Sequence, residues 1–207
     1  MPLTDDVQVR RRRGIQEAAS ELRRSQILLA AAEAFSERGF NATSLRDVAA
    51  RAKISHTGLL HHYPDKNALL EALLDDRIKG AGDLHNLNSG GGEGFVRGLV
   101  AIAANDEQHP ANVRLLTTLT AEATSPTHPA HGYFRKWHAE ALDLLAEALD
   151  DLDHRGLFRG PMSTREAARY INALREGTHT QWLLSEADFS LAAEVRSHLR
   201  LFVNVDL

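Results

Sequence analysis

The sequence predicts an all-α protein with a small N-terminal helix-turn-helix domain and a larger helical body. Between residues 25 and 74, apolar residues recur at intervals of three and four, and capping residues and a proline separate the segments. Beyond residue 95 the helical spacing continues, and no segment has the pattern of a strand. We divide the chain into an N-terminal arm (residues 1–24), a head (25–72) and a body (73–207).

The first helix of the head is predicted from one apolar stripe. Gly39 follows the stripe and can adopt the left-handed backbone that ends a helix. The stripe repeats every three or four residues, which buries one face. Its members are Ile27, Leu28, Ala31, Ala34 and Phe35.

The second helix is predicted over residues 45–52. Ser44 is placed to cap it, and Asp47 three residues later completes a capping box. The small side chain of Ala49 allows two helices to cross closely.

Residues 51–53 form the predicted turn, and a third helix follows. Ser55 can cap this helix, and Pro64 ends it by forcing Tyr63 towards an extended backbone. We expect this third helix to lie in the major groove of DNA.

The segment resembles the DNA-binding head of TetR-type bacterial transcriptional repressors, whose recognition helix commonly reads V/I-S-x-x-x-L-Y-x-H/Y-F-x-x-K. The resemblance covers roughly the first 75 residues. It implies a dimer that binds a palindromic operator in double-stranded DNA and is released by a small-molecule effector. The residues that match in order are Ile54, Ser55, Leu59, Leu60, His61, His62, Tyr63 and Lys66.

Two residues depart from the family pattern. Lys53 stands where the turn usually has glycine, so a non-glycine residue must accept a left-handed backbone at a cost of about 1 kcal/mol. Leu60 replaces a tyrosine that usually contacts phosphate, and it cannot donate a hydrogen bond.

The expected DNA contacts divide into two kinds. Phosphate contacts fix the register, and base contacts require short polar side chains at the front of the recognition helix. His62 is either a packed histidine or a further reader of bases. The phosphate set is Thr43, Arg46, Tyr63 and Lys66, with Ser44 added as a helix cap, and the base set is Ser55, His56, Thr57 and His61, with Gly58 allowing close approach.

The arm contains four consecutive arginines, Arg10 to Arg13. Such a block is commonly a solvated, flexible tail. The alternative is an arm that enters a narrow minor groove, where arginine is favoured.

Charge is distributed unevenly. The whole chain has a net charge of −4, but residues 1–80 hold 13 Lys and Arg against 11 Asp and Glu, which leaves 11 against 17 in the rest. The positive balance therefore coincides with the head. The chain has no cysteine, no apolar run near membrane-spanning length and no signal peptide, so we expect a cytoplasmic protein without a membrane partner.

The body is predicted to be helical throughout. Residues 80–94 include six glycines and are expected to form a mobile surface linker. Ser163 and Glu166 form a second capping box. The expected helices are 95–104, 111–123, 129–153, one after Ser163 that continues through Trp182, and 191–202.

The last two helices are expected to be long and apolar on more than one face, with Gly177 allowing close approach. They therefore suit a homodimer formed as a four-helix bundle. Helices of the body, the one after Ser163 included, are expected to surround an effector cavity, although each apolar candidate also fits ordinary core. The candidate lining comprises Leu116, Leu119, Phe134, Trp137, His138, Arg175, His179 and Trp182.

No cofactor and no catalytic residue are predicted. His128 and His131 are close enough in sequence to share a cation, but Pro129 lies between them and no carboxylate completes the set, so no metal site is expected. The sequence has no G-x-S-x-G or H-E-x-x-H motif. The alternative function is an all-helical enzyme or metal-binding protein with an incidental helix-turn-helix.

Overall fold

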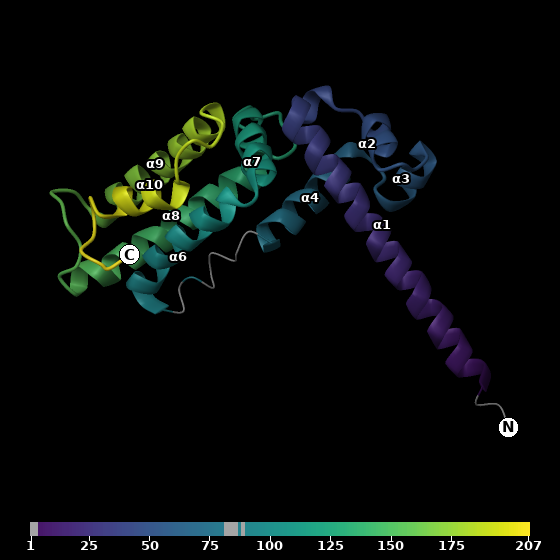
Figure 1. Ribbon diagram of the computed structural model, residues 1–207, viewed down its shortest axis with the longest axis horizontal. Coiled ribbons are helices and arrows are strands. Elements are labelled where there is room, and N and C mark those ends of the chain that lie inside the picture. The colour runs from purple at the N-terminus through teal and green to yellow at the C-terminus, as the bar shows by residue number, and fades with distance from the viewer. Residues whose placement is uncertain (1–3, 81–86, 88–89) are drawn as a thin grey trace. The chain divides into compact units, whose positions relative to one another are not determined.

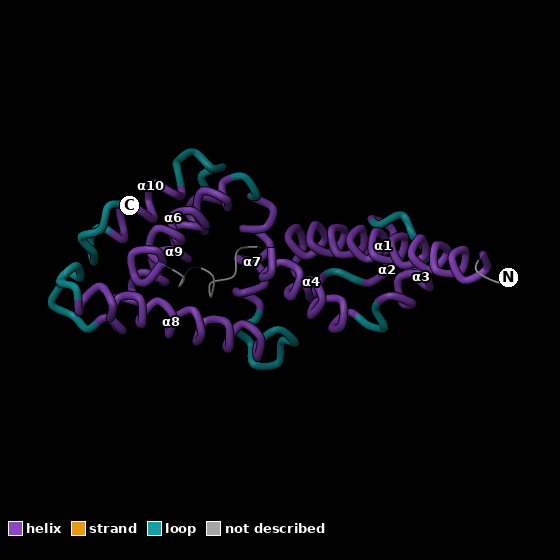
Figure 2. Tube along the Cα trace, turned by 90° about the horizontal axis from the view of Figure 1, so that it is seen from below, coloured by secondary structure: helices purple, strands orange, loops and turns teal. Residues whose placement is uncertain are grey.

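The computed structural model of the protein describes the backbone of residues 4–80, 87 and 90–207 (Figure 1). Within these residues the chain forms nine helices, and its β-structure is one isolated antiparallel bridge between Phe158 and Val203 (Figure 2). The all-α prediction is confirmed. The helices are α1 (Thr4–Ala42), α2 (Leu45–Arg51), α3 (His56–His62), α4 (Lys66–Gly80), α6 (Gly91–Glu107), α7 (Pro110–Glu122), α8 (His131–His154), α9 (Thr164–Leu184) and α10 (Leu191–Leu199).

The chain divides into two compact units, Met1–Leu73 and Leu74–Leu207, and the division falls within α4. In the first unit the apolar stripe of α1 is buried as predicted, and Leu28 at its edge is half-buried. The rings of Phe35 and Phe40 meet edge to face at 5.4 Å between centroids. This pair joins the end of α1 to the core of the head.

Helix α1 is longer than the sequence analysis expected. It begins at Thr4, so residues 4–24, expected as a flexible arm, continue the first helix of the head. Proline is absent from this stretch, and Ala, Leu, Glu and Arg are strong helix formers, so its charge does not prevent a helix. The side chains of Arg10 to Arg13 lie outside the described residues.

Gly39 interrupts the helical backbone of α1 with φ 77° and ψ 167°. This region of backbone space is open almost exclusively to glycine. Gly39→Ala is therefore expected to lower the free energy of unfolding of the head by about 1–3 kcal/mol. Gly14→Ala is the matched control because a Cβ at Gly14 in the same helix meets open space, so it should stabilise by about 0.5–1 kcal/mol. Urea unfolding followed by circular dichroism measures both, and equal effects would contradict the expectation.

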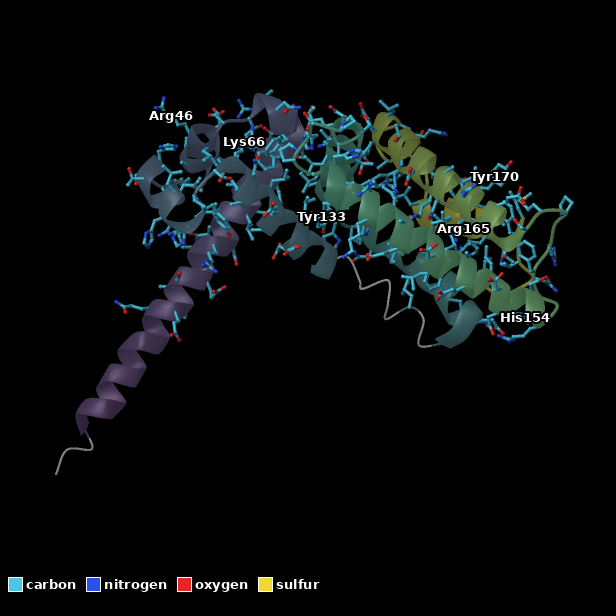
Figure 3. The ribbon with its side chains drawn as sticks, turned by 180° about the vertical axis from the view of Figure 1, so that it is seen from behind. Arg46, Lys66, Tyr133, His154, Arg165 and Tyr170 are labelled. Atoms are coloured by element: carbon cyan, nitrogen blue, oxygen red, sulfur yellow. The ribbon has the colours of Figure 1, made fainter. Side chains whose placement is uncertain are left out.

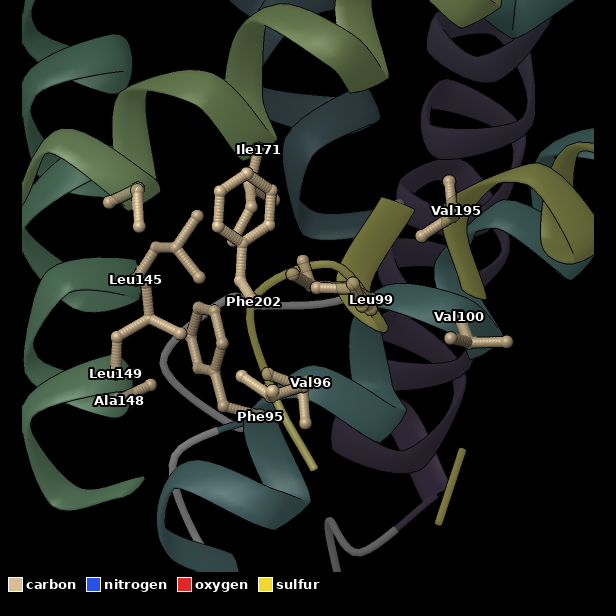
Figure 4. Packing of buried hydrophobic residues seen from close by; sticks show 14 of the residues in the cluster. Phe95, Val96, Leu99, Val100, Leu145, Ala148, Leu149, Ile171, Val195 and Phe202 are labelled. Atoms are coloured by element: carbon tan, nitrogen blue, oxygen red, sulfur yellow. The ribbon is translucent and has the colours of Figure 1, made fainter. Parts of the chain in front are cut away.

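The second unit has a large apolar core. Helices α6, α8, α9 and α10 contribute their buried faces to it, and Figure 4 shows Phe95, Leu145 and Phe202 among its side chains. The helices expected in the body are all present, with ends shifted by a few residues. Ser163 and Glu166 form the predicted capping box.

The linker predicted over residues 80–94 is helical at its C-terminal end, and its residues 81–86, 88 and 89 lie outside the described part of the chain. Helix α6 begins at Gly91 instead of Phe95, so four residues assigned to a surface linker are helical. Position 92 requires glycine, because a Cβ there would lie 2.3 Å from the carbonyl oxygen of Ala148 on α8. Its backbone N–H also donates to Asp151 Oδ2 at 2.9 Å. The glycine at position 92 therefore permits close packing of α6 on α8.

The last two helices differ in length, contrary to the expectation that both are long. Helix α9 has 21 residues, whereas α10 has nine and ends at Leu199. Leu191, Val195 and Leu199 of α10 are buried in the core of their own chain. Phe202 is also buried, but its backbone belongs to the turn that follows α10.

Candidate nucleic-acid interface and effector site

Helix α2 begins with the predicted capping box. Ser44 Oγ accepts a hydrogen bond from the backbone N of Asp47 at 3.2 Å, and the backbone N of Ser44 donates to Asp47 Oδ2 at 2.9 Å. The side-chain hydrogen bond from Ser44 and then the backbone bond lower the pKa of the Asp47 carboxyl. The charged carboxylate therefore holds the start of α2 in place.

The start and end of helix α3 agree with the sequence analysis. Ser55 Oγ accepts from the backbone N of Gly58 at 3.0 Å. Tyr63 ends the helix with an extended backbone, φ −136° and ψ 110°. The turn before α3 passes through Lys53 at φ 55°, so the non-glycine residue does adopt the expected left-handed backbone.

Arg51 connects α2 to α1 through ion pairs that were not predicted from the sequence. Its Nη1 and Nη2 atoms donate to the two carboxylate oxygens of Glu37 at 2.8 and 2.5 Å, and Nη1 also contacts Glu33 at 3.3 Å. The sequence does contain a signal for this interaction: Glu33 and Glu37 lie four residues apart and therefore on one face of α1. This bidentate pair connects α2 to α1 with a defined geometry.

Six of the predicted DNA contacts are exposed, two of which are the capping residues Ser44 and Ser55. His56, Thr57 and His61 are exposed along α3, and Arg46 extends from α2 into solvent (Figure 3). Leu60 is 37% exposed on the same helix. An apolar side chain among polar ones on α3 suits contact with a thymine methyl group instead of a phosphate.

Thr43 has a different role from the predicted phosphate contact. The residue is 2% exposed, and its Oγ1 lies within hydrogen-bonding distance of the carbonyl oxygens of Gly39 at 2.8 Å and Ala34 at 3.2 Å. Its hydroxyl therefore stabilises the distorted end of α1. A buried hydroxyl cannot reach a phosphate.

Lys66 is the first residue of α4, as predicted, but its ammonium group binds within the head. Nζ donates to the carbonyl oxygens of Phe40 at 2.6 Å and Thr43 at 2.7 Å, and it lies 4.1 Å from the centre of the Phe40 ring. These carbonyls belong to the end of α1 and the residues just after it, where the helix leaves acceptors without intrahelical donors. Lys66 is thus a helix-capping residue.

Tyr63 and His62 both pack against the head. Tyr63 is buried, consistent with a ring that belongs to the core. His62 is half-buried, and burial is the main cause that lowers its pKa, with His61, Arg24 and Arg23 adding to the effect. The packed alternative for His62 is therefore favoured over the reading of bases.

The eight residues proposed for the effector site divide by burial. Trp182 is 3% exposed, and its Nε1 donates to the carbonyl oxygen of Phe189 at 3.0 Å, so it closes the loop between α9 and α10. Its ring belongs to the common core of the body. Leu119, Phe134 and Trp182 are buried, whereas Leu116, Trp137, His138, Arg175 and His179 are half-buried.

A polar cluster lies among these residues. His138 Nδ1 on α8 is 3.2 Å from Glu176 Oε1 on α9, and His179 Nε2 is 3.2 Å from Asp106 Oδ2 on α6. The hydrogen bond from His138 is the main cause that lowers the pKa of Glu176. Asp106 was missed by the sequence analysis, although it continues the buried stripe of α6 three residues after Ala103.

Arg175 belongs to the same cluster. Burial lowers the pKa of its guanidinium, opposed by the charges of Asp106 and Glu176. The Nε atom is buried without a hydrogen-bond partner. Glu176, the next residue along α9, contacts His138, and Glu140 contacts Lys136 at 3.7 Å.

A groove of ≈ 590 Å³ runs along α9 and α10. None of the eight candidate effector residues lines it. Its walls are Ala173, Leu174, Gly177, Thr178, Gln181, Asp188, Phe189, Glu194 and His198.

In the described part of the chain, no three His, Cys, Asp or Glu side chains are grouped to hold a metal ion. None of its helices combines the length and the apolar character that crossing a membrane requires.

The geometry of α2, turn and α3 defines a helix-turn-helix protein, and comparison with known proteins specifies the family. The family model described as bacterial regulatory proteins, tetR family, matches residues 27–73. The HTH-type transcriptional regulator BetI of Escherichia coli is 31% identical over 170 residues, 79% of this chain and 84% of the relative. The chain belongs to the TetR family of bacterial regulatory proteins.

Other relatives match over different lengths. The HTH-type transcriptional repressor Rv3405c of Mycobacterium tuberculosis is 49% identical over 49 residues, which is 24% of this chain and 26% of that repressor. The chain therefore matches about a quarter of the length of this relative. The crystal structure of NalD, the secondary repressor of the MexAB-OprM multidrug efflux pump in Pseudomonas aeruginosa, has a TM-score of 0.69 at 22% identity and covers 90% of this chain and 98% of NalD. This likeness shows a shared fold.

Proposed function

We propose that the protein is a cytoplasmic, ligand-responsive transcriptional regulator, most simply a repressor, that binds a palindromic operator as a homodimer. The observation that supports it best is α3, a short capped helix with His56, Thr57 and His61 exposed along it. A helix of this kind reads base edges in the major groove. The exposed Arg46 supplies a sequence-independent phosphate contact.

The proposed dimer uses α9 and α10. Tyr170, Ala173, Gly177 and Leu184 follow one another at helical spacing on α9, and Tyr170 and Leu184 are 56% and 79% exposed (Figure 3). A Cβ at Gly177 meets nothing within 4 Å, so its backbone is open to a second chain. An apolar stripe with small residues suits close packing of helices against a second copy.

Release by an effector requires two states of the dimer. An effector dissociates the complex only if it binds better to a dimer whose heads are wrongly spaced than to the DNA-competent one. Helix α4 carries the chain from the head into the body. We propose that effector binding among the half-buried residues of α8 and α9 acts on the heads through α4.

Selection of bound sequences from a random DNA pool tests the proposed function. We expect an inverted repeat with half-sites about one helical turn or a little more apart. His56→Ala and Thr57→Ala should each change the preferred base at one position, at a cost of about 1–3 kcal/mol for the parent sequence. Recovery of no consensus at low salt would contradict DNA reading and favour the alternative of an all-helical enzyme or metal-binding protein.

The basic segment of α1 provides a second expected result. If Arg10 to Arg13 contact the minor groove, deletion of residues 1–14 should reduce the slope of log affinity against log salt by up to about 3.6, because each neutralised phosphate contributes about 0.9. Fluorescence anisotropy with the selected operator measures this slope between about 50 and 200 mM salt. An unchanged slope would assign the segment no role in binding.

A further inference from the structure

We infer that operator binding is coupled to the uptake of a proton by the adjacent histidines His61 and His62 of α3, and that Arg23 and Arg24 of α1 complete this site for a DNA phosphate. The inference rests on the proposed function and adds to it a phosphate site and a second ligand, the proton. We call these four residues the basic cluster of the head.

The phosphate contacts predicted from the sequence leave α3 short of donors. Thr43 and Lys66 bind carbonyl oxygens within the head, and Leu60 has no donor to offer. Arg51 is held by two glutamates of α1, whereas Arg46 is exposed on α2. Because several phosphate contacts are needed to fix a protein on DNA, further donors must come from α3 itself or from a helix beside it.

Helix α1 is such a neighbour. Figures 1 and 2 both show α3 beside the middle of α1, where Arg23 and Arg24 are exposed. His61 and His62 lie in the last turn of α3, with ring centroids 5.8 Å apart. Arg24 has Glu21 at 4.0 Å, but both side chains are more than half exposed, so this pair offsets little of its charge. The two helices therefore bring four basic side chains together.

The surroundings of His62 disfavour its protonated form in the free protein. Burial is the main cause that lowers the pKa of this half-buried residue. The charges of His61, Arg24 and Arg23 lower it further. Repulsion among these groups persists until an anion reaches them.

A DNA phosphate reverses this balance. Its negative charge stabilises the protonated form of both histidines, and its oxygens accept hydrogen bonds from the two arginines. The bound head then holds more protons than the free head, so affinity must rise as the pH falls. The gain is lost as the pH rises through the pKa of the histidines in the complex, within the range of about pH 5 to 8 where histidine titrates.

Two measurements on the full-length protein with the selected operator test the coupling. Fluorescence anisotropy at about pH 6 and about pH 8, at one salt concentration, should show about tenfold tighter binding at the lower pH. In the double variant His61→Gln/His62→Gln the two affinities should agree within about twofold, because glutamine does not titrate. Calorimetry in two buffers of different ionisation enthalpy counts protons directly, and the parent should take up roughly half to one proton per head near pH 7.

His56→Gln is the matched control for the histidines. His56 is also exposed on α3, but it lies at the start of the helix, so its substitution should lower affinity by the same factor at both pH values. If His56→Gln abolishes the pH dependence and the double variant retains it, the proton binds elsewhere and the inference is wrong.

The arginines are tested by the salt dependence of binding at about pH 8. The double variant Arg23→Met/Arg24→Met should reduce the slope of log affinity against log salt by about 1.8, because each neutralised phosphate contributes about 0.9. Arg38→Met is the control on the same helix. Arg38 lies 3.8 Å from Asp47, so its substitution should change the slope by less.

Equal operator affinity of the parent at the two pH values, no proton uptake, or an unchanged salt slope in the arginine variant overturns the inference. If circular dichroism shows that the double histidine variant does not fold, His61→Gln at the exposed position decides, since it should take up fewer protons than the parent. A parent that selects an inverted repeat from random DNA but takes up no proton would retain the proposed function, so the two failures are distinguishable.

Discussion

Replacing Trp182 with alanine is expected to lower the free energy of unfolding of the body by about 3–5 kcal/mol. The indole is 3% exposed within the core, and its Nε1–H bonds to the carbonyl oxygen of Phe189 in the loop before α10. The substitution leaves a cavity and an unpaired carbonyl together. Urea unfolding of the purified protein measures the loss. Operator affinity should fall with it, because a body that unfolds cannot hold the dimer.

Trp137→Ala provides the matched control. Trp137 is half-buried on α8 beside Phe134 and His138, so its removal should cost clearly less stability and act mainly on effector binding. The sequence predicts both tryptophans as candidate lining of the effector cavity. If Trp182→Ala folds as stably as the parent and only loses its response to ligand, the core position of Trp182 is wrong and that earlier placement holds.

The helices of both units could be predicted because their signals are local. Caps such as Ser44 and Ser163, the break at Pro64 and the three-to-four spacing each act within one or two helical turns. The start of α6 could not be predicted, because the need for a glycine at position 92 comes from its close approach to Ala148, a residue far away in sequence. Composition alone made the segment resemble a linker.

The candidate site was predictable to a lesser extent. Exposed positions on α3 follow from helical spacing, so His56 and Thr57 could be identified as base-reading candidates. The direction of a long side chain does not follow from spacing, and Lys66 therefore was assigned to phosphate although its ammonium group caps α1. The same reason applies to the phosphate contact predicted for Thr43. Its hydroxyl instead donates to a carbonyl oxygen exposed by the kink at Gly39.

The sequence contains a signal for the polar cluster of the body, namely charged residues at positions that face the core. Asp106 lies on the buried stripe of α6, and Arg175 and His179 lie four residues apart on the inner face of α9. Charged residues at core positions indicate either mutual pairing or a ligand. Only the structure shows that both carboxylates lie beside histidines, and that Arg175 Nε and His179 Nε2 are buried without a hydrogen-bond partner.

Lys66→Met is expected to destabilise the head by about 2–3 kcal/mol, because hydrogen bonds from a charged donor to carbonyls are each worth about 1.5–3 kcal/mol. Methionine keeps most of the aliphatic chain and removes the ammonium that binds the carbonyl oxygens of Phe40 and Thr43. The loss should appear without DNA, as a lower midpoint of thermal unfolding. Binding to operator and to random DNA should weaken together, because the head itself is disturbed.

Arg46→Met separates this capping role from a phosphate contact. Arg46 is exposed on α2, so its substitution should leave the unfolding midpoint unchanged and reduce the salt slope of DNA affinity by about 0.9. The two variants therefore differ most clearly in the absence of DNA. If Lys66→Met unfolds at the same temperature as the parent and behaves like Arg46→Met in the salt titration, Lys66 contacts phosphate after all, and its bonds to the end of α1 contribute little to stability.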